Sequence, residues 1–282
     1  MSDRMQLWLA AVASLVIATM SVTVTAESST DLLKAGKYSE AYEQAMQESG
    51  AKRSAVVDLA RDLLEVAFES PGEAQRWTAL RATRFAPDPH LIPSLRRIAR
   101  EGDRYEQSLA LDALLVASSR DAREELIQAV ASSYRPVRVR GLRGLTEQAD
   151  ESLVPMFAGI LTNEEDPNLR AMAARGLGRT GSAPAITVLR RALHDPSEIV
   201  QDEVVQALVA LDHDELASTL AEGLARASDA AGRIRWIRLM RYLRDVQNIE
   251  LLAPTLQDAD AQVRTYGAAS ILAILNRAEG KH

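Results

Sequence analysis

The chain has 282 residues, of which 47% are apolar and only 4% aromatic, and its formal net charge is −6. This apolar fraction is enough for a sizeable core, and the scarcity of aromatic residues, glycine and proline favours packed helices over sheets. An acidic chain lacks the basic surface of a general nucleic-acid binder, so nucleic acid is not an expected partner. The absence of cysteine excludes disulfides, thiolate nucleophiles and cysteine-ligated metals.

Residues 1–26 have the features of a secretory signal peptide. A short polar start precedes an apolar run from Leu7 to about Ala18, and Val24 and Ala26 are small residues at the −3 and −1 positions of a cleavage site. The alternative is an uncleaved membrane anchor, because this segment is nearly long enough to cross a bilayer. Four hydroxyl residues weaken that span. We therefore expect cleavage after Ala26 and a periplasmic or secreted protein, with membrane contact only if the segment is retained.

Residues 27–71 are expected to form two or three helices that cap the rest of the chain. The stretch LLKAGKYSEAYEQAM resembles part of a tetratricopeptide repeat, with Gly36, Tyr38 and Ala41 at matching places. Only one copy is visible, so we prefer an atypical terminal cap, as repeat proteins commonly have.

A nine-residue pattern, Val-Arg-x-x-Ala-Ala-x-Ala-Leu, recurs along residues 72–277. VRVRGLRGL, LRAMAARGL, VQDEVVQAL and VRTYGAASI fit it well, whereas EQSLALDAL, AQRWTALRA and IRWIRLMRY fit more loosely. The segments start at residues 74, 106, 137, 169, 200, 234 and 263, so their spacings range from 29 to 34 residues. Such regularity is typical of stacked structural repeats.

Each repeat is predicted to contain two antiparallel helices. With the first residue of each segment numbered as position 0, apolar residues fall at positions 0, 4, 7 and 8, which is one stripe of a helix. A second apolar helix precedes each segment, and the Asp or Asp-Pro between the two suits a helix start. Because neither helix buries its apolar face alone, we expect an all-α fold: a right-handed α-solenoid of about six to seven helix pairs, ending in a polar tail at 278–282.

The segment around residue 170 resembles a HEAT repeat. Asp166, Leu169-Arg170, Ala173-Ala174 and Leu177-Gly178 carry this resemblance, and the short period is similar to that of the HEAT-like repeats of phycobiliprotein lyases. The resemblance implies that the second helix of each pair lines a concave surface. HEAT-like relatives also include a di-iron hydroxylase built on His-Glu pairs. This chain has no His-Glu dipeptide, and nothing beyond the repeat supports bilin-lyase activity.

Few groups could carry catalysis or hold a metal. The sequence LDHDE at residues 211–215 could bind a metal through His213 and its neighbouring carboxylates, but an acidic turn before a helix is also what the helix dipole favours. Ser49-Gly50-Ala51-Lys52 matches S-x-x-K without the S-D-N and K-T-G motifs that accompany it in penicillin-binding enzymes. We therefore expect no catalytic residue, no metal and no cofactor.

Two arginine-rich stretches, YRPVRVRGLRGL and GRIRWIRLMRYLRD, interrupt the acidic chain. An arginine and aromatic patch would suit an anionic partner, and Trp and Arg are enriched at binding hot spots. The candidate partner-binding residues are Trp236, Arg238, Met240, Arg241, Arg143 and Arg175. An internal role remains an alternative for Trp236, Arg238, Arg241 and Arg143.

The arginines at position 1 of the segments suggest an internal ladder rather than a binding surface. They could pair with an aspartate in the adjoining turn. The predicted members of this ladder are Arg138, Arg170, Arg235 and Arg264, with Asp166, Asp229 and Asp260.

Three functions are compatible with these features. The leading hypothesis is a non-enzymatic periplasmic scaffold or adaptor that binds a protein or peptide partner on the solenoid surface. The first alternative is an anion-binding module for envelope glycans or lipid headgroups. The second alternative is a lyase-like enzyme or enzyme subunit, which is supported by no residue outside the repeat.

Overall fold

The computed structural model describes residues 27–48, 52–85, 87–117, 122–211 and 215–280. Within these ranges every regular element is helical, which confirms the all-α prediction. The predicted signal peptide lies outside the described residues, as do most of the S-x-x-K match and the candidate metal ligand His213. The chain divides into two compact units, Met1–Ala79 and Leu80–His282, which are described separately.

The described part of the first unit contains three helices and most of a fourth. Ser28 and Asp31 form a capping box that begins the first helix, and Gly36, with φ 75°, allows the sharp turn after it. Leu32, Leu33 and Ala41 form the buried centre of the unit. The helices are α2 (Ser29–Lys34), α3 (Tyr38–Glu48), α4 (Lys52–Phe68) and α5 (Glu73–Ala82), the last of which crosses into the second unit.

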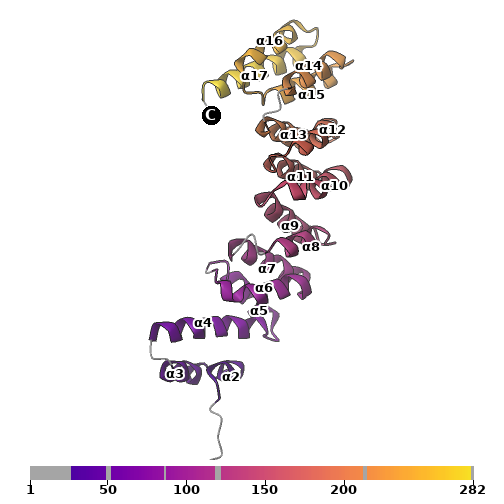
Figure 1. The fold of residues 1–282 in the computed structure, drawn as a ribbon. Coiled ribbons are helices and arrows are strands. Elements are labelled where there is room, and N and C mark those ends of the chain that lie inside the picture. The colour runs from indigo at the N-terminus through magenta and orange to yellow at the C-terminus, as the bar shows by residue number, and fades with distance from the viewer. Residues whose placement is uncertain (1–26, 49–51, 86, 118–121, 212–214, 281–282) are drawn as a thin grey trace, which may run out of the picture. The chain divides into compact units, whose positions relative to one another are not determined.

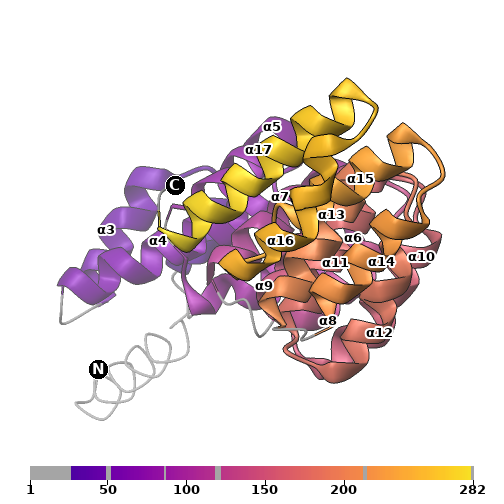
Figure 2. The ribbon, with the colours of Figure 1, turned by 90° about the horizontal axis from the view of Figure 1, so that it is seen from above.

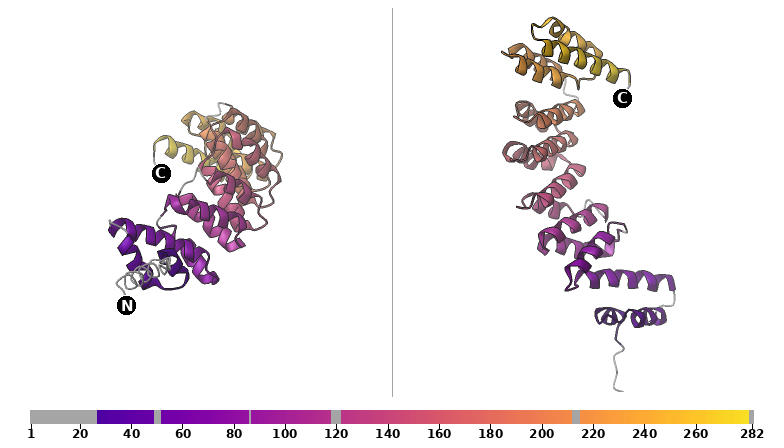
Figure 3. Two further views of the ribbon diagram at one scale, coloured as in Figure 1. Left: turned by 60° about the horizontal axis from the view of Figure 1, so that its bottom comes forward. Right: turned by 180° about the vertical axis from the view of Figure 1, so that it is seen from behind.

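The described part of the second unit consists of consecutive antiparallel helix pairs that stack on one another (Figures 1 and 3). The pairs are α6 (Ile92–Glu101) with α7 (Arg104–Ala117), α8 (Arg123–Val130) with α9 (Arg135–Glu147), α10 (Val154–Asn163) with α11 (Pro167–Arg179), α12 (Ala183–Ala192) with α13 (Glu198–Ala210), α14 (Leu216–Arg226) with α15 (Ala230–Met240), and α16 (Ile249–Leu252) with α17 (Ala261–Ala278). Short 3-10 helices precede or extend three of the first helices: η1 (Pro89–Leu91), η2 (Glu151–Leu153), and η3 (Val246–Asn248) with η4 (Ala253–Gln257).

The two helices of each pair occupy different layers. Seen from above, α10, α12 and α14 gather on one side of α9, α11 and α13 (Figure 2). The second helices α7, α9, α11 and α13 pack against one another in chain order, and their apolar stripes are buried. Small residues set the spacing: a Cβ added to Gly178 would lie 2.7 Å from the Cβ of Ala207, so only glycine permits this approach of α11 to α13. This arrangement confirms the predicted α-solenoid.

The pair α14–α15 corrects the register of one segment. Asp166 and Asp260 cap their helices three residues before position 0, and Asp229 caps α15 in the same way. Position 0 of this repeat is therefore Gly232 and not residue 234. With this change the two spacings become 32 and 31 residues instead of 34 and 29. The misassignment arose because Ile234 offers a better apolar match to position 0 than glycine does.

No helix in the described ranges is both long and apolar enough to cross a membrane.

Candidate functional site

Arginines at position 1 form hydrogen bonds with the turn between the two helices of their own repeat. The Nη1 of Arg170 donates to the carbonyl oxygens of Glu164 and Glu165, both at 2.9 Å. Arg138 makes the same pair of contacts with residues 132 and 133, and Arg264 with residues 258 and 259. These carbonyls lie at the end of the preceding helix and in the turn, where they have no intrahelical donor. Each arginine therefore holds the two helices of its pair together.

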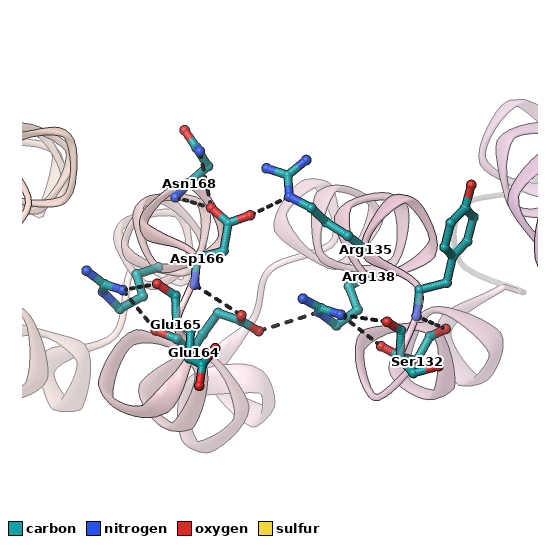
Figure 4. Close-up of polar contacts among 10 residues, drawn as sticks. Ser132, Arg135, Arg138, Glu164, Glu165, Asp166 and Asn168 are labelled. Carbon is teal, nitrogen blue, oxygen red and sulfur yellow. Dashed lines mark hydrogen bonds and ion pairs between the residues drawn. The ribbon is translucent and has the colours of Figure 1, made fainter.

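Arg138 and Arg170, and also Arg233 at position 1 of the α14–α15 repeat, reach a carboxylate of the next repeat. Arg170 forms a bidentate pair with Asp195, at 2.9 Å and 3.0 Å, and this contact raises the pKa of Arg170. We call such a pair a turn rung, and the turn rungs are Arg138–Glu164, Arg170–Asp195 and Arg233–Asp258. Each carboxylate lies five residues before position 0 of its repeat and also accepts the backbone N–H two residues further along. Figure 4 shows the first turn rung and its surroundings.

The predicted ladder therefore requires two corrections. Asp166, Asp229 and Asp260 accept backbone N–H groups at the starts of α11, α15 and α17 and make no ion pair with the position-1 arginine of their own turn. Arg235 is not a member, because position 1 of its repeat is occupied by Arg233. The sequence could not reveal the true carboxylates, because they belong to the neighbouring repeat.

Met240 is fully buried and Trp236 is only 5% exposed, although the sequence predicted both on a partner-binding surface. In the corrected register they fill positions 4 and 8 of the apolar stripe. Trp236 is much larger than the glycine, alanine or valine at position 4 of the other well-matched repeats, and Gly223 on α14 makes room for it. A Cβ on Gly223 would lie 2.5 Å from the indole ring. Met240 has no exposed surface.

The four candidate arginines all pair with carboxylates of a neighbouring repeat. Arg143 contacts Asp112 at 3.1 Å, and Arg175 forms a bidentate pair with Glu203 at 2.7–2.8 Å. Arg241 contacts Asp202 at 2.8 Å, and Arg238, itself buried, contacts Glu198 and Asp202. A glycan or lipid phosphate at these positions would compete with carboxylates already in place. This pairing disfavours the anionic patch that the sequence suggested.

The helix α15 is displaced along α13. Where α9 meets α7, Arg143 pairs with a carboxylate 31 residues earlier, which equals the repeat period. Where α15 meets α13, Arg238 and Arg241 pair with carboxylates 40 and 39 residues earlier. Arg238 also contacts Asp202, 36 residues earlier, so the excess over the repeat period corresponds to about one to two helical turns. The beginning of α15 therefore extends beyond the beginning of α13 and leaves part of the α14–α15 pair uncovered.

The same junction lacks a turn rung. Position 1 is Gln201 in place of arginine, and Ala227 occupies the place of the carboxylate. Gln201 still donates its Nε2 to the carbonyl oxygen of Asp195 at 2.6 Å, but it reaches no group of the next repeat among the described residues. The junction between α6–α7 and α8–α9 also lacks a turn rung, but Arg96 there pairs with the buried Glu125.

A groove of about 1490 Å³ opens at this displaced junction, and we call it the step groove. Its walls are the turn between α12 and α13, one face of α14 along its length, the first turns of α15 as far as Trp236, and Gln262 and Tyr266 of α17. Ala230, Ala231 and Ile234 contribute small or apolar side chains to it. Polar groups on its walls include Gln201, Arg235 and Glu198. The sequence carried one sign of this site, Gln201 in place of the arginine at position 1 of the other well-matched segments.

Two polar atoms beside the step groove are buried and have no hydrogen-bond partner among the described residues. One is the Nε of Arg235, whose guanidinium stacks over the Trp236 ring at 5.2 Å from its centroid. The other is the Oε1 of Gln201. The ring of His194 meets Trp236 edge-on, with centroids 5.4 Å apart. The groove is thus bordered by one guanidinium, that of Arg235, which makes no ion pair with the described residues.

The described ranges contain no cluster of three or more histidine, aspartate or glutamate side chains placed to hold a metal ion.

Residues 123–209 match the family model for HEAT repeats. This region covers α8 to α13 and ends directly before the displaced pair α14–α15. No curated protein matches the chain.

Several solved structures resemble the chain at low identity. Human deoxyhypusine hydroxylase in complex with glycerol is 17% identical, over 88% of this chain and 96% of that chain, with a TM-score of 0.35. The CpcE–CpcF complex of phycocyanin lyase from Nostoc sp. PCC7120 is 16% identical, over 78% and 94%, with a TM-score of 0.46. An engineered protein is 15% identical, over 88% and 83%, with a TM-score of 0.43. Such likeness carries no inference about activity.

Proposed function

We propose that this protein is a non-enzymatic scaffold that binds a peptide segment of a protein partner in the step groove. The observation that carries the proposal is the displaced junction itself, where the stacking of α15 on α13 is reduced and part of the α14–α15 pair is left uncovered. The groove exceeds the range of roughly 300–1,000 Å³ that is usual for small-molecule pockets. An extended or helical segment of a partner would fill such a space better than a metabolite.

The proposal includes export from the cytoplasm, which rests on the composition of residues 1–26. A periplasmic or secreted protein would begin at Glu27 after cleavage. Amino-terminal sequencing of the protein recovered outside the cytoplasm tests this part, and a chain still beginning at Met1 would contradict it.

Selection of random peptides displayed on phage against the full chain tests the binding site. Ala231 is exposed on the wall of the groove, so Ala231→Trp fills the groove without entering the core. Ala225→Trp is the matched control, because Ala225 is exposed on α14 outside the groove lining. Selected peptides should bind the wild type and Ala225→Trp equally and lose most of their affinity for Ala231→Trp. Peptides that bind all three proteins alike would refute the proposed site.

A further inference from the structure

We infer that the step groove recognises an acidic side chain of its peptide partner, and that the aspartate or glutamate binds to Arg235. This inference rests on the proposed function and names the chemistry that the groove selects. The inference is based on the ion pairs and hydrogen bonds of the charged side chains that line the groove: all of them except Arg235 have such a partner among the described residues.

Most of the other charged groups of the groove are occupied. Arg190 pairs with Glu215 at 3.1 Å, and Arg226 pairs with Glu222 at 2.9 Å. Glu198 pairs with Arg238, and Asp229 accepts the N–H of Gly232 at 2.7 Å. Arg235, in contrast, contacts the face of Trp236 and makes no ion pair with the described residues. The guanidinium of Arg235 therefore has N–H groups available for hydrogen bonds to a ligand.

The Arg235 side chain is already oriented for recognition. The cation–π contact with Trp236 restrains the Arg235 side chain, which limits the side-chain entropy lost when a ligand binds. The planar fork of an arginine matches a carboxylate through two parallel hydrogen bonds. At the other junctions an arginine and a carboxylate of the protein supply this contact, as in Arg170–Asp195. At this junction the carboxylate comes from the partner.

The surrounding charges favour a carboxylate over a phosphate group. Glu198, Glu215, Glu222 and Asp229 all line the groove, and each would repel an anion. A phosphate group carries nearly twice the charge of a carboxylate at neutral pH, so it meets about twice the repulsion. The fork of one guanidinium therefore fits the acidic side chain of a peptide better than a phosphate group.

The test uses peptides selected on the wild-type full chain by the phage display described above. Each selected peptide is synthesised in two forms, one with its acidic residue and one with the matching amide, and both are titrated against three proteins. On the wild type the acidic form should bind about tenfold more tightly, as expected for a charge-assisted contact. On Arg235→Gln the two forms should bind equally. Arg190→Gln, which removes a paired arginine from the same groove, should keep the preference.

The outcomes separate the two proposals. Peptides that are blocked by Ala231→Trp but bind equally as acid and amide would overturn the role of Arg235 and leave the groove intact. An acid preference that survives Arg235→Gln would overturn it as well. Peptides indifferent to Ala231→Trp would overturn the proposed function. Thermal melts by circular dichroism confirm that each variant is folded.

Discussion

Arg170 and Asp195 form a bidentate ion pair between the second helix of one repeat and the turn of the next, and the same arginine also binds two carbonyl oxygens of its own turn. Both side chains are nearly buried, with 12% and 8% of their surfaces exposed. One side chain therefore closes a helix pair and joins it to its neighbour.

Loss of this contact should destabilise the second unit. Arg170→Ala leaves Asp195 without its counter-charge and two carbonyls without donors, which should lower the free energy of unfolding by about 3 kcal/mol. Arg190→Ala removes a pair whose members are largely exposed and should cost less than about 1 kcal/mol. Urea denaturation followed by circular dichroism measures both. Equal losses would contradict the role given to the turn rung.

Glycine replacements on α14 and α10 should have opposite effects. Gly223→Ala places a methyl group against the Trp236 ring, which should cost about 1–3 kcal/mol. Gly159→Ala on α10 meets no atom within 4 Å and should stabilise the protein by about 0.5–1 kcal/mol through higher helix propensity. Denaturant titration of both variants tests the packing of α14 on α15. A neutral Gly223→Ala would show that Trp236 lies elsewhere.

Protonation of Asp166 should lower the free energy of unfolding in acid. The hydrogen bond from Arg135, followed by those from Asn168, holds the pKa of Asp166 below its usual value. Because the folded-state pKa lies below the unfolded value of about 3.9, the stabilisation is complete above that pH and is lost as pH falls through the folded-state pKa. Asp166→Asn can still cap α11, so it removes mainly the charge.

Urea denaturation of the wild type and Asp166→Asn between neutral pH and about pH 2 measures this effect. The wild type should be more stable near neutrality, and the difference should shrink steadily below about pH 4. A difference that stays constant across the range would show that the Asp166 charge contributes nothing.

The displaced junction should be the weakest joint of the second unit. In a stacked repeat protein, cooperativity depends on the interfaces between neighbours. Here Arg238 and Arg241 replace the turn rung by contacting α13. Arg238→Met should therefore raise hydrogen exchange in α14–α17 more than in α8–α13. Mass spectrometry of exchanged peptides measures the two regions in one sample, and a uniform increase would contradict a weak joint.

The sequence predicted the helix pairs and their period because these depend on local patterns. Asp166 before Leu169 and the small residues of LRAMAARGL are visible without coordinates. The partners of Arg138 and Arg170 were not predictable, since Glu164 and Asp195 approach only after the repeats stack. The step groove depends on how far α15 moves along α13, and no residue pattern encodes that distance. The buried Trp236 was misplaced because its segment was read two residues out of register.

Because the turn rungs repeat with the same geometry, whole repeats of the second unit can be removed or added. Glu164 and Asp195 hold equivalent places 31 residues apart, and each receives the arginine of the repeat before it. A chain shortened by residues 139–170 would put Arg138 in the place of Arg170, bring it against Asp195 and preserve an arginine–carboxylate contact at that junction. The part of the protein before the step groove can therefore be lengthened or shortened in whole repeats, while the groove, which belongs to the pairs on either side of one junction, keeps its composition.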